Sequence, residues 1–240
     1  MNKGMECPNA HDEDRPTVYF HSGSTRKAIQ YQYLFGCYGY ALHRSRLAVA
    51  LTEPQVEGPG ASSEIALVEE PLKYLARFAE RTQRYPLVVE DTMLFVEHFN
   101  LEYDSRPFLP GPDTKRWWDA LGDKGLLEML RGSQRRRALY VCQLGVLRAK
   151  GDYRFFRAEL SGRVAHEIRS TRHAETNFPR TNATYFHSVF VPDGYESTLA
   201  EMDAASFSSV DYRRRCVERA VTSIDGIARP ATGQGRLFAS

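Results

Sequence analysis

The sequence lacks several features that would assign a protein to a class at once. Its 240 residues contain four widely spaced cysteines and no CxxC pair, which argues against a zinc or thioredoxin-like site. The N-terminal stretch carries no apolar segment typical of a secretory signal, so we expect reduced thiols in a cytoplasmic protein. No apolar run approaches the roughly 20 residues of a membrane span, so we expect no membrane partner.

The sequence also lacks a strong excess of charge of either sign. Lysine and arginine number 32 against 30 acidic residues, giving a formal net charge of +2. Two short basic runs, residues 135–137 and 213–215, are candidates for a nucleic-acid footprint; the alternative is that one is a solvated loop and the other straddles a helix face. With so little net charge, we expect no nucleic-acid polymer as a partner. A hydrophobic content of 42% is ordinary for a globular protein.

No internal repeat or clean linker divides the chain. We predict a disordered segment at residues 1–16, a single α/β domain at residues 17–225 and a flexible tail at residues 226–240. Strands and helices alternate first, and antiparallel hairpins come later. This order predicts a mixed central sheet with two lobes flanking a cleft.

The functional interpretation depends on residues 87–92, which read LVVEDT. The apolar run predicts a buried strand, and the two acids then lie at its carboxyl end, where sheet folds place ligands. Neighbouring strand residues point to opposite faces, so only one acid easily faces a site. We hypothesise that Asp91 holds a hard cation and that Glu90 does not contact the cation but lies behind Asp91. The alternative is that Asp91 only caps the following turn.

A second candidate site follows the first predicted strand, residues 17–21. A small polar turn at residues 22–25 leads into a predicted helix at residues 26–35, whose first N–H groups would face an anion. Lys27 lies in the first helical turn, where a cation opposes the helix dipole unless it faces a phosphate. The other predicted strands are residues 47–51, 87–89, 94–96, 138–149, 153–160 and 186–191. The other predicted helices are residues 64–84, 114–121 (capped by Asp113), 125–130 and 209–224.

Four motifs then occur in one order along the chain. They are LVVEDT at residues 87–92, LPGP at 109–112 with Lys115 beyond it, FR at 156–157 before SGR at 161–163, and FVPDGYE at 190–196 before AEM at 200–202. With this order, residues 17–224 resemble the Ham1 / inosine triphosphate pyrophosphatase family, especially its eukaryotic-type branch. The resemblance implies a hydrolase that cleaves a nucleoside triphosphate to the monophosphate and pyrophosphate in its cleft. It also implies Mg²⁺, with Mn²⁺ as a substitute, and a homodimer.

The resemblance implies roles for residues that would contact the phosphates. Ser22, Ser24 and Lys27 match the turn in which the family holds the triphosphate, with Ser24 in place of an asparagine. Lys73 stands for a phosphate-contacting lysine. Lys27 is thereby implied to be both substrate-binding and catalytic, because a cation there stabilises the charge that develops during cleavage.

The resemblance also implies a metal site and a catalytic carboxylate. Glu53 and Asp91 match the family's metal ligands. Mg²⁺ prefers oxygen ligands, takes few carboxylates and completes its shell with phosphate oxygens and water. Asp91 would in addition orient or deprotonate the attacking water.

The chain departs from the family where the nucleobase is expected. Residues 184–188 replace a Phe-Gly-Trp/Tyr-Asp-Pro segment and lack its Gly, Asp and Pro, and Phe207 replaces a lysine. Residues 211–213 keep only the arginine of a Ser-His-Arg motif. One interpretation is an active pyrophosphatase with a rewritten base pocket. The other is a catalytically weakened nucleotide-binding or interaction protein on the same fold.

Under the first interpretation, four residues supply the new contacts to the substrate: His187, Asp211, Tyr212 and Arg213. Two of them have structural alternatives. His187 is equally consistent with a core or loop histidine, and Asp211 with a cap of the last helix, since it stands near the start of that helix.

Overall fold

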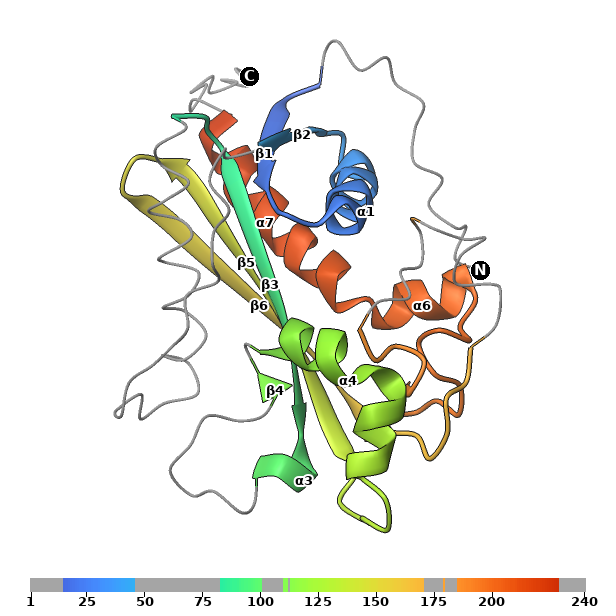
Figure 1. The fold of residues 1–240 in the computed structure, drawn as a ribbon. Helices are drawn as coiled ribbons and strands as arrows, with labels where there is room; N and C mark the ends of the chain where they lie inside the picture. The colour runs from blue at the N-terminus through green and yellow to red at the C-terminus, as the bar shows by residue number, and fades with distance from the viewer. Residues whose placement is uncertain are drawn as a thin grey trace, which may run out of the picture.

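A computed structural model of the chain describes residues 15–45, 83–100, 110–111, 113–170, 179 and 185–228. Within these residues, seven strands form one mixed sheet in the order β2-β1-β3-β5-β6-β7, with β4 paired to β3 (Figure 1). The strands are β1 (Thr17–His21), β2 (Ala41–Ser45), β3 (Leu87–Val96), β4 (Pro110–Gly111), β5 (Arg137–Ala149), β6 (Asp152–Val164) and β7 (Phe190–Pro192). The predicted mixed α/β class is confirmed.

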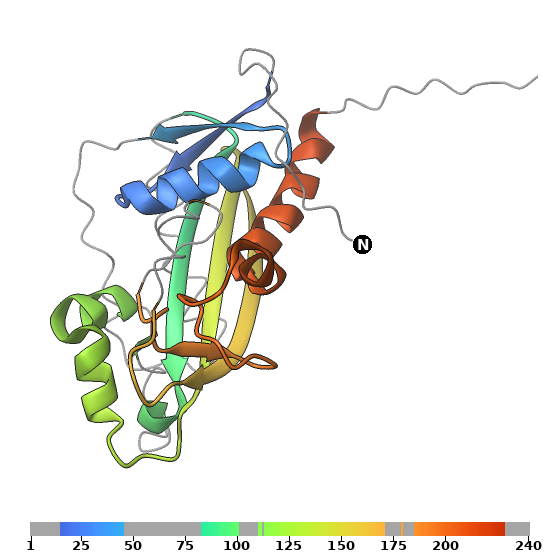
Figure 2. The same cartoon turned by 90° about the vertical axis from the view of Figure 1, so that its right-hand side faces the viewer.

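Helices pack on this sheet and extend beyond its ends. They are α1 (Thr25–Gly36), α3 (Glu97–Asn100), α4 (Thr114–Met129), α6 (Ala204–Val210) and α7 (Tyr212–Ala228). Helix α7 packs along β5 and β6 and also touches α1, so the two helices lie together against the sheet (Figure 2). The predicted apolar face of the last helix is buried, with Val217, Val221 and Ile224 at most 6% exposed. No helix in the described part of the chain has the length and apolar character needed to span a membrane.

Strand β3 differs from its prediction in a way that matters for the site. We expected two short strands separated by the acids, but β3 runs unbroken from Leu87 to Val96. Its antiparallel pairing with β5 continues through Glu90 and Asp91, which face Leu144 and Gln143 in register. The parallel neighbour β1, however, pairs with β3 only as far as Val89. The acids therefore lie just past the carboxyl end of β1, not at the end of their own strand.

Three further element predictions need correction. The strand predicted at residues 186–191 begins only at Phe190, because residues 185–189 form turns and Phe186 has a positive φ of 62°. The helices predicted at residues 114–121 and 125–130 form a single element, kinked at Gly122. The last helix is interrupted at Asp211, whose extended backbone separates α6 from α7.

Other predictions fall outside the described residues or were not made. The predicted strand 47–51, all but the last two residues of the predicted helix 64–84, and the candidate residues Glu53 and Lys73 lie outside the described part of the chain. The predicted β5–β6 hairpin is confirmed, with Gly151 at a positive φ of 81° in its turn. Strand β2 was not predicted.

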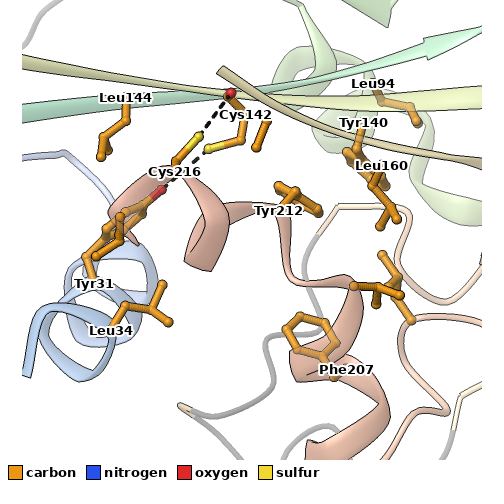
Figure 3. Close-up of a cluster of buried hydrophobic side chains, with 14 of the residues drawn as sticks. Tyr31, Leu34, Leu94, Tyr140, Cys142, Leu144, Leu160, Phe207, Tyr212 and Cys216 are labelled. Carbon is orange, nitrogen blue, oxygen red and sulfur yellow. Dashed lines mark hydrogen bonds between the residues drawn. The ribbon is translucent and has the colours of Figure 1, made fainter. Parts of the chain in front are cut away.

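Two of the cysteines are buried free thiols between the sheet and the helices. The Cys216 thiol donates to the backbone carbonyl of Cys142 (3.4 Å), and the Tyr31 hydroxyl lies 3.6 Å from the Cys142 sulfur (Figure 3). Cys37 at the end of α1 is disulfide-bonded. The expectation of reduced thiols is therefore confirmed for Cys142 and Cys216 and wrong for Cys37.

A glycine in β6 tests the packing of the short strand β7. A Cβ at Gly162 would lie 2.3 Å from the backbone oxygen of Val191 and 2.7 Å from the ring of Phe190. We expect Gly162→Ala to lower the free energy of unfolding by about 2 kcal/mol, as overpacking a core typically does. Chemical denaturation measures this change. Gly36→Ala is the matched control, because a Cβ there meets nothing within 4 Å. Equal stability of the two variants would contradict the prediction.

Candidate functional site

The turn between β1 and α1 is built by two serine hydroxyls. Ser24 is the N-cap of α1, and its hydroxyl accepts a hydrogen bond from the Lys27 N–H (3.2 Å). The Ser22 hydroxyl accepts one from the Ser24 N–H (3.1 Å). The predicted strand, turn and helix are thus confirmed, and both hydroxyls shape the turn. The turn places Lys27 in the first helical turn, on the side of α1 that faces β3.

Arg44, which sequence reasoning missed, clamps the same turn from strand β2. Its Nε donates to the Ser22 carbonyl (3.1 Å), Nη2 to the Gly23 carbonyl (2.9 Å) and Nη1 to the Thr25 hydroxyl (3.0 Å). An arginine near the end of a strand is not distinctive in sequence. Only the parallel pairing of β1 with β2 shows that Arg44 lies beside the turn.

Glu90 lies at the centre of the site, with its side chain fully buried. Its Oε2 is 2.9 Å from the Lys27 ammonium, and its Oε1 is 3.6 Å from Nε of Arg213. The Thr92 hydroxyl, on the same face of β3, also donates to Oε1. We expected Glu90 only to support Asp91. Instead, it is the residue that joins the predicted phosphate lysine to the predicted substrate arginine.

The surroundings keep this buried ion pair charged. Burial by itself raises the pKa of Glu90, but the positive charges of Lys27 and Arg213 outweigh it and hold the pKa below its usual range. Burial by itself lowers the pKa of Lys27, but Glu90 and then Asp91 more than offset it, and the pKa is raised. Carboxylate and ammonium are therefore both ionised at neutral pH.

Asp91 is the next residue of β3, so its side chain leaves the opposite face of the strand. It is half-buried, and its charge helps to raise the pKa of Lys27. Its Oδ1 accepts a hydrogen bond from the Thr92 N–H (2.9 Å). As a partly exposed carboxylate near Lys27, it has the hard oxygen donors that Mg²⁺ prefers. Among the residues that the structure describes, no cluster of three histidine, cysteine or acidic side chains is arranged around a metal. Since Mg²⁺ needs few protein ligands, Asp91 fits such an ion without a cluster.

The residues predicted to contact the base are packed together in the interior. The Nε2 of His187 lies 3.1 Å from the Tyr212 hydroxyl, and the Tyr212 ring stacks on Tyr140 with centroids 5.3 Å apart. Phe207 lies against the His187 ring. These side chains are at most 2% exposed, and Figure 3 shows Phe207, Tyr140 and Tyr212 in the core. The structure thus places His187 in the core, as the structural alternative expected.

Asp211 and Arg213 have defined structural contacts. The Asp211 carboxylate accepts hydrogen bonds from the N–H groups of Arg213 (2.9 Å) and Arg214 (3.2 Å), so it caps α7, as the alternative interpretation proposed. Arg213 is 1% exposed and donates to Gln30 (3.2 Å) and to the Thr92 hydroxyl (3.3 Å). The structure therefore brings Arg213, Lys27 and Glu90 into one cluster.

Comparison with known proteins identifies the family of the chain. The model of the Ham1 family matches residues 18–223. The chain belongs to the Ham1 family. A dITP/XTP pyrophosphatase of Methanopyrus kandleri is 27% identical over 202 residues, which cover 84% of this chain and 93% of that protein. An inosine triphosphate pyrophosphatase of Candida albicans is 28% identical over 153 residues, or 63% of this chain and 67% of that one.

The fold of this Ham1 family member agrees with solved structures. The Ham1 protein of Staphylococcus aureus superposes with a TM-score of 0.62 at 17% identity, covering 88% of this chain and 99% of that one. A HAM1 protein of Coxiella burnetii gives a TM-score of 0.61 at 17% identity. The family model thus confirms the resemblance seen in the sequence motifs, and the solved structures agree with it in fold.

The buried carboxylate gives a prediction for stability. Glu90→Gln removes the buried negative charge that Lys27 and Arg213 share, so we expect a loss of about 3 kcal/mol at pH 7, as for other broken buried pairs. In the unchanged protein, the contribution of Glu90 is fully present above its ordinary pKa of 4.5 and is lost as the pH falls through its lower native pKa. The variant should therefore lose stability less steeply on acidification.

Urea unfolding between pH 7 and pH 3, in the presence of a chelator, measures both effects. Glu128→Gln is the control, because Glu128 pairs with Arg131 on the exposed surface of the molecule. Such exposed pairs contribute at most about 1 kcal/mol. If the Glu90 and Glu128 variants lost the same free energy of unfolding, the buried pair would contribute no more to stability than an exposed one.

Proposed function

We propose that this Ham1 family member is a Mg²⁺-dependent pyrophosphatase that hydrolyses a non-canonical or modified nucleoside triphosphate to the monophosphate and pyrophosphate. The observation that carries the proposal is the Lys27 ammonium, held 2.9 Å from buried Glu90 at the start of α1 and beside half-buried Asp91. The relatives named dITP/XTP and inosine triphosphate pyrophosphatases support the reaction and the substrate class.

The accessible charges of the site suit a polyphosphate bound together with a cation. The two positive charges of Lys27 and Arg213 are matched by Glu90, which they share, and by Asp91, whose carboxylate we assign to the cation. Lys27 is the residue of the two that is nearer to solvent, with a side chain 16% exposed against 2% for Arg213. The N-terminus of α1 adds its partial positive charge at the same place.

The residues of the site then have the following roles in the proposed reaction. A water molecule attacks the α-phosphorus, the bond from that phosphorus to the bridging oxygen breaks, and this oxygen leaves with pyrophosphate. Asp91 orients the water and accepts its proton. Lys27 and the start of α1 stabilise the negative charge that develops on the phosphate oxygens. Ser22 and Ser24 keep the turn in the shape that receives the phosphates.

A metal ion would be held by Asp91 together with Glu53, and Lys73 would contact the phosphates, as the family resemblance implies. When bound, Mg²⁺ or Mn²⁺ neutralises phosphate charge and acts as a Lewis acid. Asp91 is the described residue whose chemistry fits this role. Its carboxylate is partly accessible, whereas that of Glu90 is fully buried and engaged by two cations.

The environment of the base is also part of the proposal. The replaced segment at residues 184–188 supports a base site altered from the family pattern, whereas His187 and Tyr212 contact each other in the interior. Phe207, at the position of the family's lysine, is 1% exposed in an aromatic cluster. This observation favours the second candidate function, a nucleotide-binding protein that has lost turnover. A homodimer in the cytoplasm completes the proposal, and analytical ultracentrifugation tests the dimer.

A substrate panel separates the two candidate functions. We expect Mg²⁺-dependent release of pyrophosphate, rather than free phosphate, from at least one of ITP, dITP, XTP and the common or modified triphosphates. A coupled pyrophosphate assay measures the release, with chelator as the control. Thermal stabilisation by nucleotide without product would support the binding protein. No turnover and no stabilisation by any nucleotide would reject both candidates.

A single carboxylate tests the catalytic assignment. We expect Asp91→Asn to lower kcat by at least about 100-fold, the usual contribution of a general base. Its melting temperature should stay close to that of the unchanged protein, because Asp91 is half-buried and its Oδ1 bond can be made by an amide oxygen. Asp119→Asn, on the exposed side of α4, is the control and should keep full activity. Full turnover by the Asp91 variant would remove this residue from the mechanism.

A further inference from the structure

Arg213 is an arginine in the interior of the protein, in the first turn of α7. Its side chain is only 2% exposed. Burying a guanidinium costs several kcal/mol unless charged and polar partners surround it. Its three nitrogens have such partners: Nε faces Glu90 (3.6 Å), Nη1 donates to Gln30 (3.2 Å) and Nη2 donates to Thr92 (3.3 Å). Two of the nitrogens therefore donate hydrogen bonds, whereas Nε makes no hydrogen bond and faces the Glu90 carboxylate as an ion pair.

These partners come from two elements other than α7. Gln30 lies on α1, one turn beyond Lys27, whereas Glu90 and Thr92 lie on the same face of β3. Helices α1 and α7 pack against each other (Figure 2). Arg213 is thus the point at which α7 is joined both to the helix that carries Lys27 and to the strand that carries the acids.

The two oxygens of the Glu90 carboxylate divide these contacts between them. Oε1 faces the Arg213 Nε, accepts from the Thr92 hydroxyl and lies 3.8 Å from the Cys142 thiol. Oε2 faces Lys27. Because a carboxylate is planar and rigid, holding Oε1 also fixes the direction in which Oε2 points. The position of the Lys27 ammonium therefore depends on contacts made at the other oxygen.

We propose that Arg213 is a positioning residue, which fixes the Lys27 ammonium at the reacting phosphates through the Glu90 carboxylate that both cations share. This inference rests on the proposed pyrophosphatase function. It differs from the role in substrate binding that the family resemblance implies for this arginine. A positioning residue affects cleavage of every nucleotide alike, whereas a residue that contacts the base changes the preference among bases.

Arg213→Met removes the charge and the fork of donors while filling much of the volume. We expect kcat to fall by about 100-fold, the loss that a misplacement of about 1 Å can cause. KM should change by less than about threefold, because Lys27 still attracts the phosphates. The ratios of kcat/KM among ITP, XTP and ATP should stay as in the unchanged protein. A change of more than about tenfold in these ratios would overturn the proposal in favour of base contact.

Arg136→Met is the matched control, because Arg136 is also a buried arginine (8% exposed). Its guanidinium donates to the backbone carbonyls of Leu130, Val164 and Ala165. This variant should lose stability but keep its kcat per folded molecule. If both variants lowered kcat equally, Arg213 would have only a structural role.

Two further variants keep the test decisive if Arg213→Met does not fold. Arg213→Lys keeps the charge, but a single ammonium cannot reach three acceptors as the arginine fork does. We expect it to recover part of the lost kcat. Thr92→Val removes the hydroxyl from Oε1 and changes no charge, and it should lower kcat by a smaller factor with the same unchanged base ratios. Full kcat in both variants would contradict the proposal.

Amide hydrogen exchange tests whether Arg213 holds α1 in place, and this measurement does not depend on catalytic turnover. The peptide covering residues 25–30 should exchange faster in the Arg213 variants than in the unchanged protein, and at an unchanged rate in Arg136→Met. If the unchanged protein cleaves no nucleotide, the proposed function fails, and exchange alone then decides whether Arg213 holds α1. Exchange at the unchanged rate in every Arg213 variant would overturn the inference.

Discussion

The arrangement of the site depends on one buried carboxylate that two cations share. Glu90 lies between Lys27 of α1 and Arg213 of α7, and each of these charges would be costly in the interior without the others. The interaction also fixes geometry, because it joins two helices to the middle of β3. Lys27, which we propose contacts the phosphates, is therefore placed by the core of the protein and not by its own helix alone.

Glu90 and Asp91 have different environments because of the pleat of the strand. Adjacent residues on β3 point to opposite faces, so Glu90 enters the buried side and Asp91 stays partly accessible. Glu90 thus serves as a buried counter-ion, and Asp91 offers a carboxylate suited to a cation. Their position just beyond the end of β1 brings both acids next to the turn that precedes α1.

Much of the secondary structure around this site was predictable, because its strands, turn and helix each have a clear pattern over a few neighbouring residues. The turn at Ser22 to Lys27 was predictable from a strand, small polar residues and a helix start. Asp91 was proposed as a site residue from an apolar run followed by acids, and it stays a prediction. The central role of Glu90 was not predictable, because it depends on Arg213, more than 120 residues away. For the same reason, the pattern of β3 could not show that its acids lie within a continuous strand paired with β5.

Arg44 gives the turn between β1 and α1 a property that the turn's own residues do not suggest. Two carbonyls and a hydroxyl of the turn are bound by a side chain about twenty residues downstream, on a strand at the end of the sheet order. The conformation of this turn therefore depends also on a tertiary contact, although its sequence has the pattern of a local motif. The three bonds from Arg44 form only when β2 docks beside β1. A peptide covering β1 and α1 alone would therefore keep the two serine bonds of the turn but lack the side chain that holds its carbonyls.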